Sequence, residues 1–200
     1  MTTIQDPASA AAEGLFIRAK DIQHSQPALS IAHAHRLDAD SAAVMGLMPQ
    51  PSPRSILAFS GPAGEFISQG KSWSLDAPAQ CGAAAGTLEF QAAGAEGSSW
   101  LLSLASADGQ ALQVGTHGDA RRAAFRGSCA GLSLSGDGRG ANVSFGSFSI
   151  LEIERDDSGA VTKIAVDFEQ RSEQPHFPAL TGSLRIKSSI PSRQPGAALA

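Results

Sequence analysis

Short runs in which apolar and polar residues alternate begin at Arg54 and recur to Lys187, with turn-forming residues between them. Successive side chains of a β-strand point to opposite faces of a sheet, so this alternation predicts strands that bury one face. The strands expected from the pattern are residues 55–59, 65–67, 72–75, 87–90, 99–104, 111–114, 131–135, 147–154, 161–169 and 180–187.

Two connections between these runs have the composition of hairpin turns. The pair Asp108-Gly109 favours a tight turn between 99–104 and 111–114, and Asp-Asp-Ser-Gly at 156–159 predicts the clearest hairpin of the chain. No long amphipathic helix separates the runs, and about ten short strands at this spacing are typical of a sandwich or barrel. Residues 54–190 are therefore expected to form an all-β domain, an antiparallel β-sandwich or barrel.

Both ends of the chain lack this pattern. Residues 1–48 are rich in alanine and hold three of the five histidines, which predicts an N-terminal extension that is partly helical or an extended arm. The prolines of 49–53 predict a semi-rigid linker. The Pro, Gly and Ala residues of 191–200 predict a disordered tail.

Charge and hydropathy narrow the classes of partner. Charged residues make up 17% of the chain and the net charge is −4, which disfavours nucleic acid or an anionic membrane as the partner. No apolar run reaches the roughly 18 residues that a membrane span needs. The N-terminus has no basic segment followed by an apolar one, so no export signal is expected and the cytoplasm is the default compartment.

Cys81 and Cys129 are the two cysteines, fewer than a disulfide framework normally has. We expect two buried thiols, with a single disulfide as the alternative for an exported protein. Neither cysteine has a histidine at metal-ligand spacing, which disfavours zinc.

Several stretches between Arg54 and Pro191 form a recognisable set, although each is weak by itself. They are Val114-Gly115-Thr116, Ala120 to Phe125, Gly131 to Asn142 with its Gly-Arg-Gly-x-Asn motif, Gly146-Ser147-Phe148 with Glu152, Ala165 to Gln170 with its Asp-Phe-Glu-Gln motif, and Leu180 to Arg185. Together they resemble an uncharacterised family of bacterial all-β domains found in hypothetical proteins. The resemblance implies the fold and no mechanism, because that family has no established activity.

The chain departs from this family in one informative way. Family members often have Cys where this chain has Ala141, and His-Cys where it has Arg171-Ser172. If those cysteines pair, the resemblance implies that the loop at Asn142 lies beside the end of strand 161–169. Both cysteines are absent here, which fits a chain that stays reduced.

The first candidate site is an acidic strip on the hairpin 147–169. Pairing the two strands core to core places Glu152, Glu154, Asp167 and Glu169 on one surface. Four carboxylates could bind Ca²⁺, although a solvated outer face is the simpler interpretation. Phe148 and Ile150 fall on the Glu152 face, so a bulge near residues 150–151 is needed to re-aim the strand.

The second candidate combines a loop and an aromatic side chain. Asp137, Arg139 and Asn142 lie in a Gly-rich stretch that resembles calcium loops in composition but lacks the downstream Glu of an EF-hand. A tight turn explains the glycines equally well, and Arg139 could bond Glu169 or Asp167. Trp73 could stack on a sugar ring beside this loop, whereas Trp100 is expected in the core.

The histidines offer two weaker sites. His24, His33 and His35 could bind a transition metal, although a polar, flexible segment is the simpler interpretation. His117-Gly118-Asp119 could belong to a hydrolytic triad, but the chain has no Gly-x-Ser-x-Gly elbow and no serine that can be named as the partner.

These observations rank three classes of function. A non-catalytic structural or protein-interaction domain comes first, with the N-terminal region available for a protein partner or for self-association. A carbohydrate- or other ligand-binding module, using Trp73 with Asp137, Arg139 and Asn142, is the alternative. An enzyme that uses the hairpin carboxylates comes third.

Overall fold

The computed structural model describes residues 52–84 and 86–193. Our predictions for the N-terminal extension 1–48, including the three histidines there, lie outside these residues. So do most of the linker and residues 194–200 of the tail.

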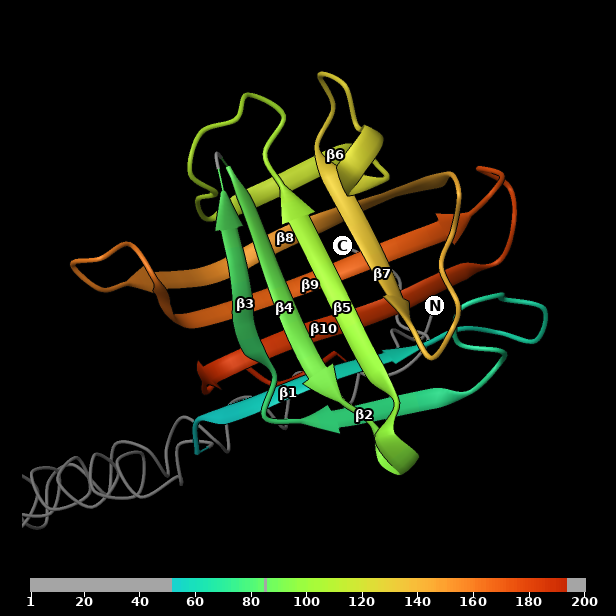
Figure 1. The fold of residues 1–200 in the computed structure, drawn as a ribbon, viewed down its shortest axis with the longest axis horizontal. Coiled ribbons are helices and arrows are strands. Elements are labelled where there is room, and N and C mark those ends of the chain that lie inside the picture. The colour runs from blue at the N-terminus through green and yellow to red at the C-terminus, as the bar shows by residue number, and fades with distance from the viewer. Residues whose placement is uncertain (1–51, 85, 194–200) are drawn as a thin grey trace, which may run out of the picture. The chain divides into compact units, whose positions relative to one another are not determined.

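Ten strands form one sheet, which confirms the all-β class predicted from the sequence (Figure 1). The strands are β1 (Arg54–Ser60), β2 (Ser72–Asp76), β3 (Ala79–Ala84), β4 (Thr87–Ala93), β5 (Ser99–Ala105), β6 (Gly115–Arg121), β7 (Gly131–Gly136), β8 (Ser144–Arg155), β9 (Val161–Ser172) and β10 (Ala179–Ser188). Two short 3-10 helices, η1 (Ala95–Gly97) and η2 (Ala123–Phe125), lie between strands. Among the residues that the structure describes, none of the helices has the length and hydropathy of a membrane span.

The sheet curls back on itself into a half-barrel of two layers. Its strand order is β2-β1-β10-β9-β8-β6-β7-β5-β4-β3. Figure 1 shows β3, β4, β5 and β7 in front, crossing the long strands β8, β9 and β10 behind them at a steep angle. The layers meet at β6 and β7, which share one parallel pair, Arg121 with Gly131, whereas the other neighbouring strands are antiparallel.

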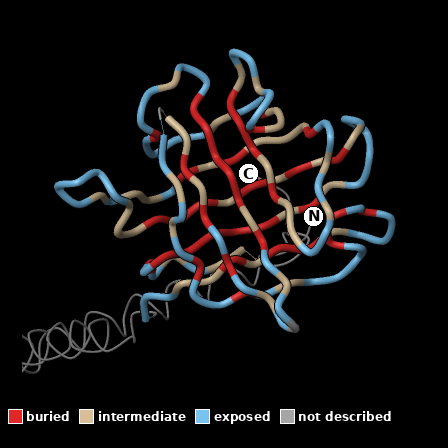
Figure 2. The backbone as a smooth tube through the Cα atoms, viewed as in Figure 1, coloured by how far each residue is buried: buried red, intermediate tan, exposed pale blue. Residues whose placement is uncertain are grey.

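The core lies between the two layers, where the alternation places the apolar side chains; Figure 2 shows buried residues along the strands of both layers. One row of opposed residues crosses the back layer from β2 to β6: Trp73, Phe59, Gly182, Phe168, Phe148 and His117. A Cβ on Gly182 would lie 2.3 Å from Phe168 Cζ, so the missing side chain leaves room for that ring. Trp100 of β5, fully buried as predicted, packs against Phe59 with ring centroids 4.7 Å apart and joins the layers.

Side-chain hydrogen bonds replace the backbone ladder where β7 turns away from β8 and β9. The buried amide of Gln170 accepts a hydrogen bond from Leu134 N (2.8 Å) and donates one to Leu134 O (3.3 Å). Ser144 Oγ, also buried, donates to Leu132 O at 3.0 Å. Because buried backbone groups must be paired, these contacts allow the sheet to fold back at this boundary.

Two predicted strands are wrong, for local reasons. Residues 65–67 form a turn, because the buried Glu65 carboxylate accepts hydrogen bonds from Ile67 N and Ser68 N. Residues 111–114 are a loop in which Leu112 is buried but Val114 is 62% exposed, so the expected hairpin at Asp108-Gly109 does not form.

Two strands were missed. β3 is an edge strand of small residues with little burial, and β6 has little apolar alternation because most of its side chains are exposed. Neither therefore carries the pattern from which strands are predicted.

The hairpin of β8 and β9 is confirmed, with the predicted bulge. The register shifts between Ile150 and Glu152, and the intervening Leu151 is exposed. The turn is closed by the Asp156 carboxylate, which accepts hydrogen bonds from Ser158 N and Ala160 N.

The first residues of the predicted disordered tail lie against the sheet. Arg185 on the outer face of β10 is 1% exposed, and its guanidinium donates to Ile190 O and Pro191 O. The same guanidinium donates a hydrogen bond to Asp167 at 2.7 Å. The segment after β10 therefore covers an arginine whose charge is paired.

Replacing Gln170 with leucine should destabilise the domain by about 2–4 kcal/mol, because Leu134 N–H and C=O would be buried without partners. Denaturant-induced unfolding of Gln170→Leu, with Gln91→Leu on an exposed strand position as the control, measures this. We expect the control to change stability by less than about 0.5 kcal/mol. Equal stabilities of the two variants would contradict the role given to Gln170.

Candidate binding groove

A polar groove lies on the outer face of the front layer, opposite the core. Glu89 of β4, Ser103 of β5 and Ser133 of β7 are directly opposed across the three strands. Their neighbours along each strand, among them Leu88, Leu102 and Leu132, are buried in the core. Alternation therefore turns the row Glu89–Ser103–Ser133 outward, where it forms the floor of the groove.

The 3-10 helix η2 forms one wall of the groove and packs on β5 and β7. Ala123 N at its start donates to Ser133 Oγ at 3.0 Å, which fixes η2 to the floor. Arg126 then crosses above Gly131, where a Cβ would lie 2.9 Å from Arg126 Cδ. Because Gly131 has no side chain, the Arg126 side chain can pass over the sheet at this point.

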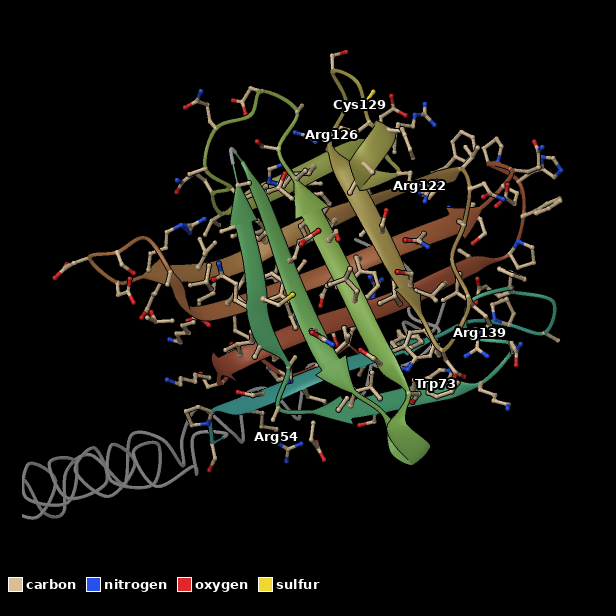
Figure 3. All side chains as sticks on the ribbon, viewed as in Figure 1. Arg54, Trp73, Arg122, Arg126, Cys129 and Arg139 are labelled. Atoms are coloured by element: carbon tan, nitrogen blue, oxygen red, sulfur yellow. The ribbon has the colours of Figure 1, made fainter. Side chains whose placement is uncertain are left out.

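Arg126 and Arg122 bring two positive charges to the groove (Figure 3). Arg126 donates from Nε to Ser106 O (3.2 Å) and from Nη1 to Ala123 O (3.3 Å). Arg122 donates to Asn142 O (3.2 Å), and its guanidinium lies 4.9 Å from the centre of the Phe125 ring. Within the described residues, neither arginine forms a salt bridge, whereas Arg121 and Arg185 do.

The groove has a volume of about 400 Å³ and a mixed lining. It reaches down to the boundary between β7 and β9, where Gln170 and Ser144 lie. Glu89 supplies a negative charge on the floor, and Ser103 Oγ donates to its Oε1 at 3.2 Å. A ligand in this groove would therefore meet arginine donors at the η2 wall and a carboxylate with hydroxyl groups on the floor.

The residues that the sequence proposed for ligand binding lie in two separate places. Asp137 and Gly138 form a tight turn with positive φ values of 51° and 73°, as the turn interpretation expected. Asn142 lies beside the end of β9 and donates from its backbone to Glu173 Oε1 at 2.7 Å, the proximity that the family resemblance implied. Asn142 borders the groove through Arg122, whereas Figure 3 places Arg139 and Trp73 at the opposite end of the front layer.

Arg139 and Trp73 belong to a packed cluster. The Arg139 guanidinium lies 5.5 Å from the Trp73 ring centre and 5.3 Å from that of Trp100, and Nε donates to Ile67 O. Its charge is paired with Asp137 at 3.0 Å, and not with Glu169 or Asp167 as we considered. The half-buried Trp73 stacks on Phe59 and donates a hydrogen bond to Ser68 O, so its ring packs against other residues of the protein.

The acidic strip lies on one surface, as the pairing and the bulge at Leu151 predict, but all four of its carboxylates pair with basic side chains. Glu152 and Glu154 bond Lys163, at 2.6 and 3.4 Å. Asp167 bonds Arg185, and Glu169 bonds Arg171. No group of three or more His, Cys, Asp or Glu residues in the described part of the chain is arranged to hold a metal ion. The calcium hypothesis therefore gains no support from this geometry.

His117 and Asp119 point to different partners. The His117 ring stacks on Phe148 with centroids 4.5 Å apart, and Asp119 forms a salt bridge with Arg121. In the described region neither residue reaches the serines of the groove. A triad that uses this pair has no geometric support.

Both cysteines are free thiols, and the prediction that both are buried is wrong. Cys81 is exposed because it lies on the edge strand β3, at a register shift between Gln80 and Gly82. Partial desolvation, followed by the nearby charge of Glu89, raises the pKa of the Cys81 thiol above its ordinary value.

No family model, curated protein or solved structure matches this chain. The resemblance to the uncharacterised bacterial family therefore stays an expectation.

Sequence reasoning missed the groove, although part of its signal was present. The alternation of Leu with Ser in 131–135 and of Leu and Phe with Glu in 87–90 already turns Ser133 and Glu89 away from the core. Nothing local indicated that η2 would fold over these positions. The positions of Arg122 and Arg126 depend on that long-range contact.

Replacing Glu152 with glutamine should reduce stability at pH 7 but not at pH 3. Hydrogen bonds from Lys163 and Ser188 hold the pKa of Glu152 below its ordinary value of 4.5. A lowered folded-state pKa stabilises the protein above the unfolded value, and this contribution is lost as the pH falls through the folded value. Urea unfolding of wild type and Glu152→Gln at both pH values measures the difference.

Glu154→Gln is the matched control, because the Glu154 side chain is 61% exposed and lies 3.4 Å from Lys163. We expect it to change stability little at either pH. A Glu152→Gln effect that is the same at pH 7 and pH 3 would contradict the pairing.

Proposed function

We propose that the described domain is a non-catalytic binding domain that holds a small anionic ligand in the groove beside η2. The observation that carries the proposal is the pair Arg122 and Arg126, whose hydrogen bonds to the described residues all go to carbonyl oxygens. A guanidinium has five N–H donors and binds carboxylate or phosphate oxygens through charge-assisted hydrogen bonds. Two such groups on one concave surface favour an anion.

The size of the groove suits a small molecule, and two further features favour binding over catalysis. The groove volume of about 400 Å³ lies within the range common for small-molecule sites, roughly 300–1,000 Å³. Its serines donate to or accept from groups of the protein itself, as Ser103 does to Glu89 and Ser133 does from Ala123. Neither of the described histidines, His117 and His176, lines the groove, so its serines have no imidazole base among them.

Arg126→Gln and Arg122→Gln should each weaken anion binding about tenfold or more, since a charge-assisted hydrogen bond contributes roughly 1.5–3 kcal/mol. Isothermal titration of the full-length protein with acetate, inorganic phosphate and glucuronate, at low and high salt, measures this. Arg54→Gln is the control, because Arg54 is exposed at the start of β1, far from η2 in Figure 3. Binding of none of the three anions, or equal binding by all variants, would overturn the proposal.

A second candidate function, self-association, is favoured by an exposed apolar surface next to the groove. Phe125, Val143 and Phe177, here called the apolar rim, are 74%, 45% and 44% exposed. The loops that carry them are joined by hydrogen bonds through Asn142 and Glu173. Exposed clusters of aromatic residues with arginine are typical of protein interfaces.

The charges on this rim are self-complementary. Arg122 stacks on Phe125, and Glu173 lies beside Val143 on the same surface. In a two-fold symmetric contact the same patch is used by both copies, so Arg122 of one copy can face Glu173 of the other. This favours self-association through the β domain, whereas the sequence suggested the N-terminal region for a protein partner or for self-association.

The double variant Phe125→Ser with Phe177→Ser should shift the full-length protein toward monomer, because it removes two aromatic anchors. Sedimentation velocity over a range of concentrations measures the shift, with Phe66→Ser, an exposed aromatic elsewhere at 54% exposure, as the control. A wild-type protein that is monomeric at all concentrations would contradict this candidate.

A further inference from the structure

Among the described residues, hydrogen-bond donors without a partner lie at one end of the groove, and acceptors without a partner lie at the other. At the η2 wall, Arg126 uses two of its five N–H groups on carbonyls and Arg122 uses one, so several donors have no acceptor among the described residues. This end can bind a group that accepts hydrogen bonds and carries negative charge.

The floor offers the opposite chemistry. Ser103 donates to Glu89 Oε1, which leaves the lone pairs of Ser103 and the second oxygen of Glu89 as acceptors. Glu89 Oε2 lies over Gly82 of β3, where a Cβ would be 2.8 Å away, so the missing side chain leaves room for the carboxylate there. A ligand over this end must donate hydrogen bonds, as hydroxyl groups do.

Ser133 lies between the two ends. Its Oγ accepts from Ala123 N, so its own hydrogen is available to donate. It lies directly opposite Ser103, and Ser135 of the same strand lies two residues further along the same face. The serines can therefore both donate and accept, which suits the hydroxyl groups of a sugar ring.

Charge and size disfavour simpler ligands. A small inorganic anion would satisfy the arginines but would be repelled by Glu89, and a neutral sugar would leave the arginines without an anion. The volume of about 400 Å³ exceeds the need of a single carboxylate or phosphate group. The groove fits one or two linked rings that carry hydroxyl groups and a carboxylate.

Building on the proposed function, we infer that the ligand is a sugar acid of the uronate type, with its carboxylate toward Arg122 and Arg126 and its hydroxyl groups toward Glu89, Ser103 and Ser133. The two ends together determine the specificity. The arginine end disfavours a ligand without a negative charge, and the Glu89 end disfavours a ligand without hydroxyl groups. This differs from the sequence hypothesis, in which Trp73 would stack on the sugar.

Titration of full-length wild type, Arg126→Gln and Glu89→Ala with glucuronate, digalacturonate, glucose, glycine and inorganic phosphate tests the inference. Glucuronate should bind at least tenfold more tightly than phosphate, glucose or glycine. Arg126→Gln should weaken all anion binding about tenfold. Glu89→Ala should weaken glucuronate about tenfold while strengthening phosphate, because it removes both an acceptor and a repulsive charge.

Gln91→Ala, at the next outward position of β4, is the matched control for Glu89→Ala and should leave glucuronate binding unchanged. Thermal unfolding of each variant shows that the fold is retained, and Glu89→Gln replaces Glu89→Ala if the latter unfolds. Binding of phosphate or glycine in preference to glucuronate, dependent on Arg126, would overturn the uronate assignment and leave the binding function standing. Binding of no probe would overturn both.

Discussion

The side-chain amide of Gln170 lies where the backbone ladder of the sheet is interrupted, and both ends of the amide are used. It bonds Leu134 N–H and C=O in the way that a neighbouring strand would. Elsewhere neighbouring strands pair antiparallel, with local register shifts, but β6 and β7 share one parallel pair. Without a partner, the backbone of β7 could not turn away from β8 and β9 inside the protein, because buried peptide groups must be hydrogen-bonded.

The groove depends on this turn. Because β7 leaves the back layer, β3, β4, β5 and β7 form a separate front layer with an outward face of its own. The connection from β6 to β7 carries η2, which folds over that face and is fixed by Ser133. Gln170 and Ser144 then lie at the base of the groove and Arg122 and Arg126 at its wall. Gln170, which supports the turn of β7 away from the back layer, therefore lies next to the groove.

The row of opposed residues that crosses the back layer, from Trp73 to His117, depends on a position without a side chain as well as on its large aromatic rings. Gly182 lies between Phe59 and Phe168, and the Phe168 ring occupies the space where a Cβ would be. Gly131 does the same for Arg126 on the other face of the front layer. Both glycines have backbone conformations open to other residues, and close packing explains why glycine fits there.

The sequence by itself determined the alternation, and with it most strands, the hairpin of β8 and β9, and the bulge at Leu151. These follow from the period of two in a strand and from local turns, which need no knowledge of the rest of the chain. The same period turned Glu89 and Ser133 outward. Strands without that pattern, β3 and β6, were missed for the same reason.

Only the tertiary structure decided which outward positions became a groove and which charges became paired. The acidic strip was placed on the correct surface, and Lys163 and Arg171, which pair with three of its carboxylates, lie on the same hairpin, but Arg185, which pairs with Asp167, comes from the neighbouring strand β10. Arg122 and Arg126 reach the groove because η2 folds over β5 and β7. Contacts between residues far apart in the chain depend on how the sheet curls, and alternation within single strands carries no information about that curl.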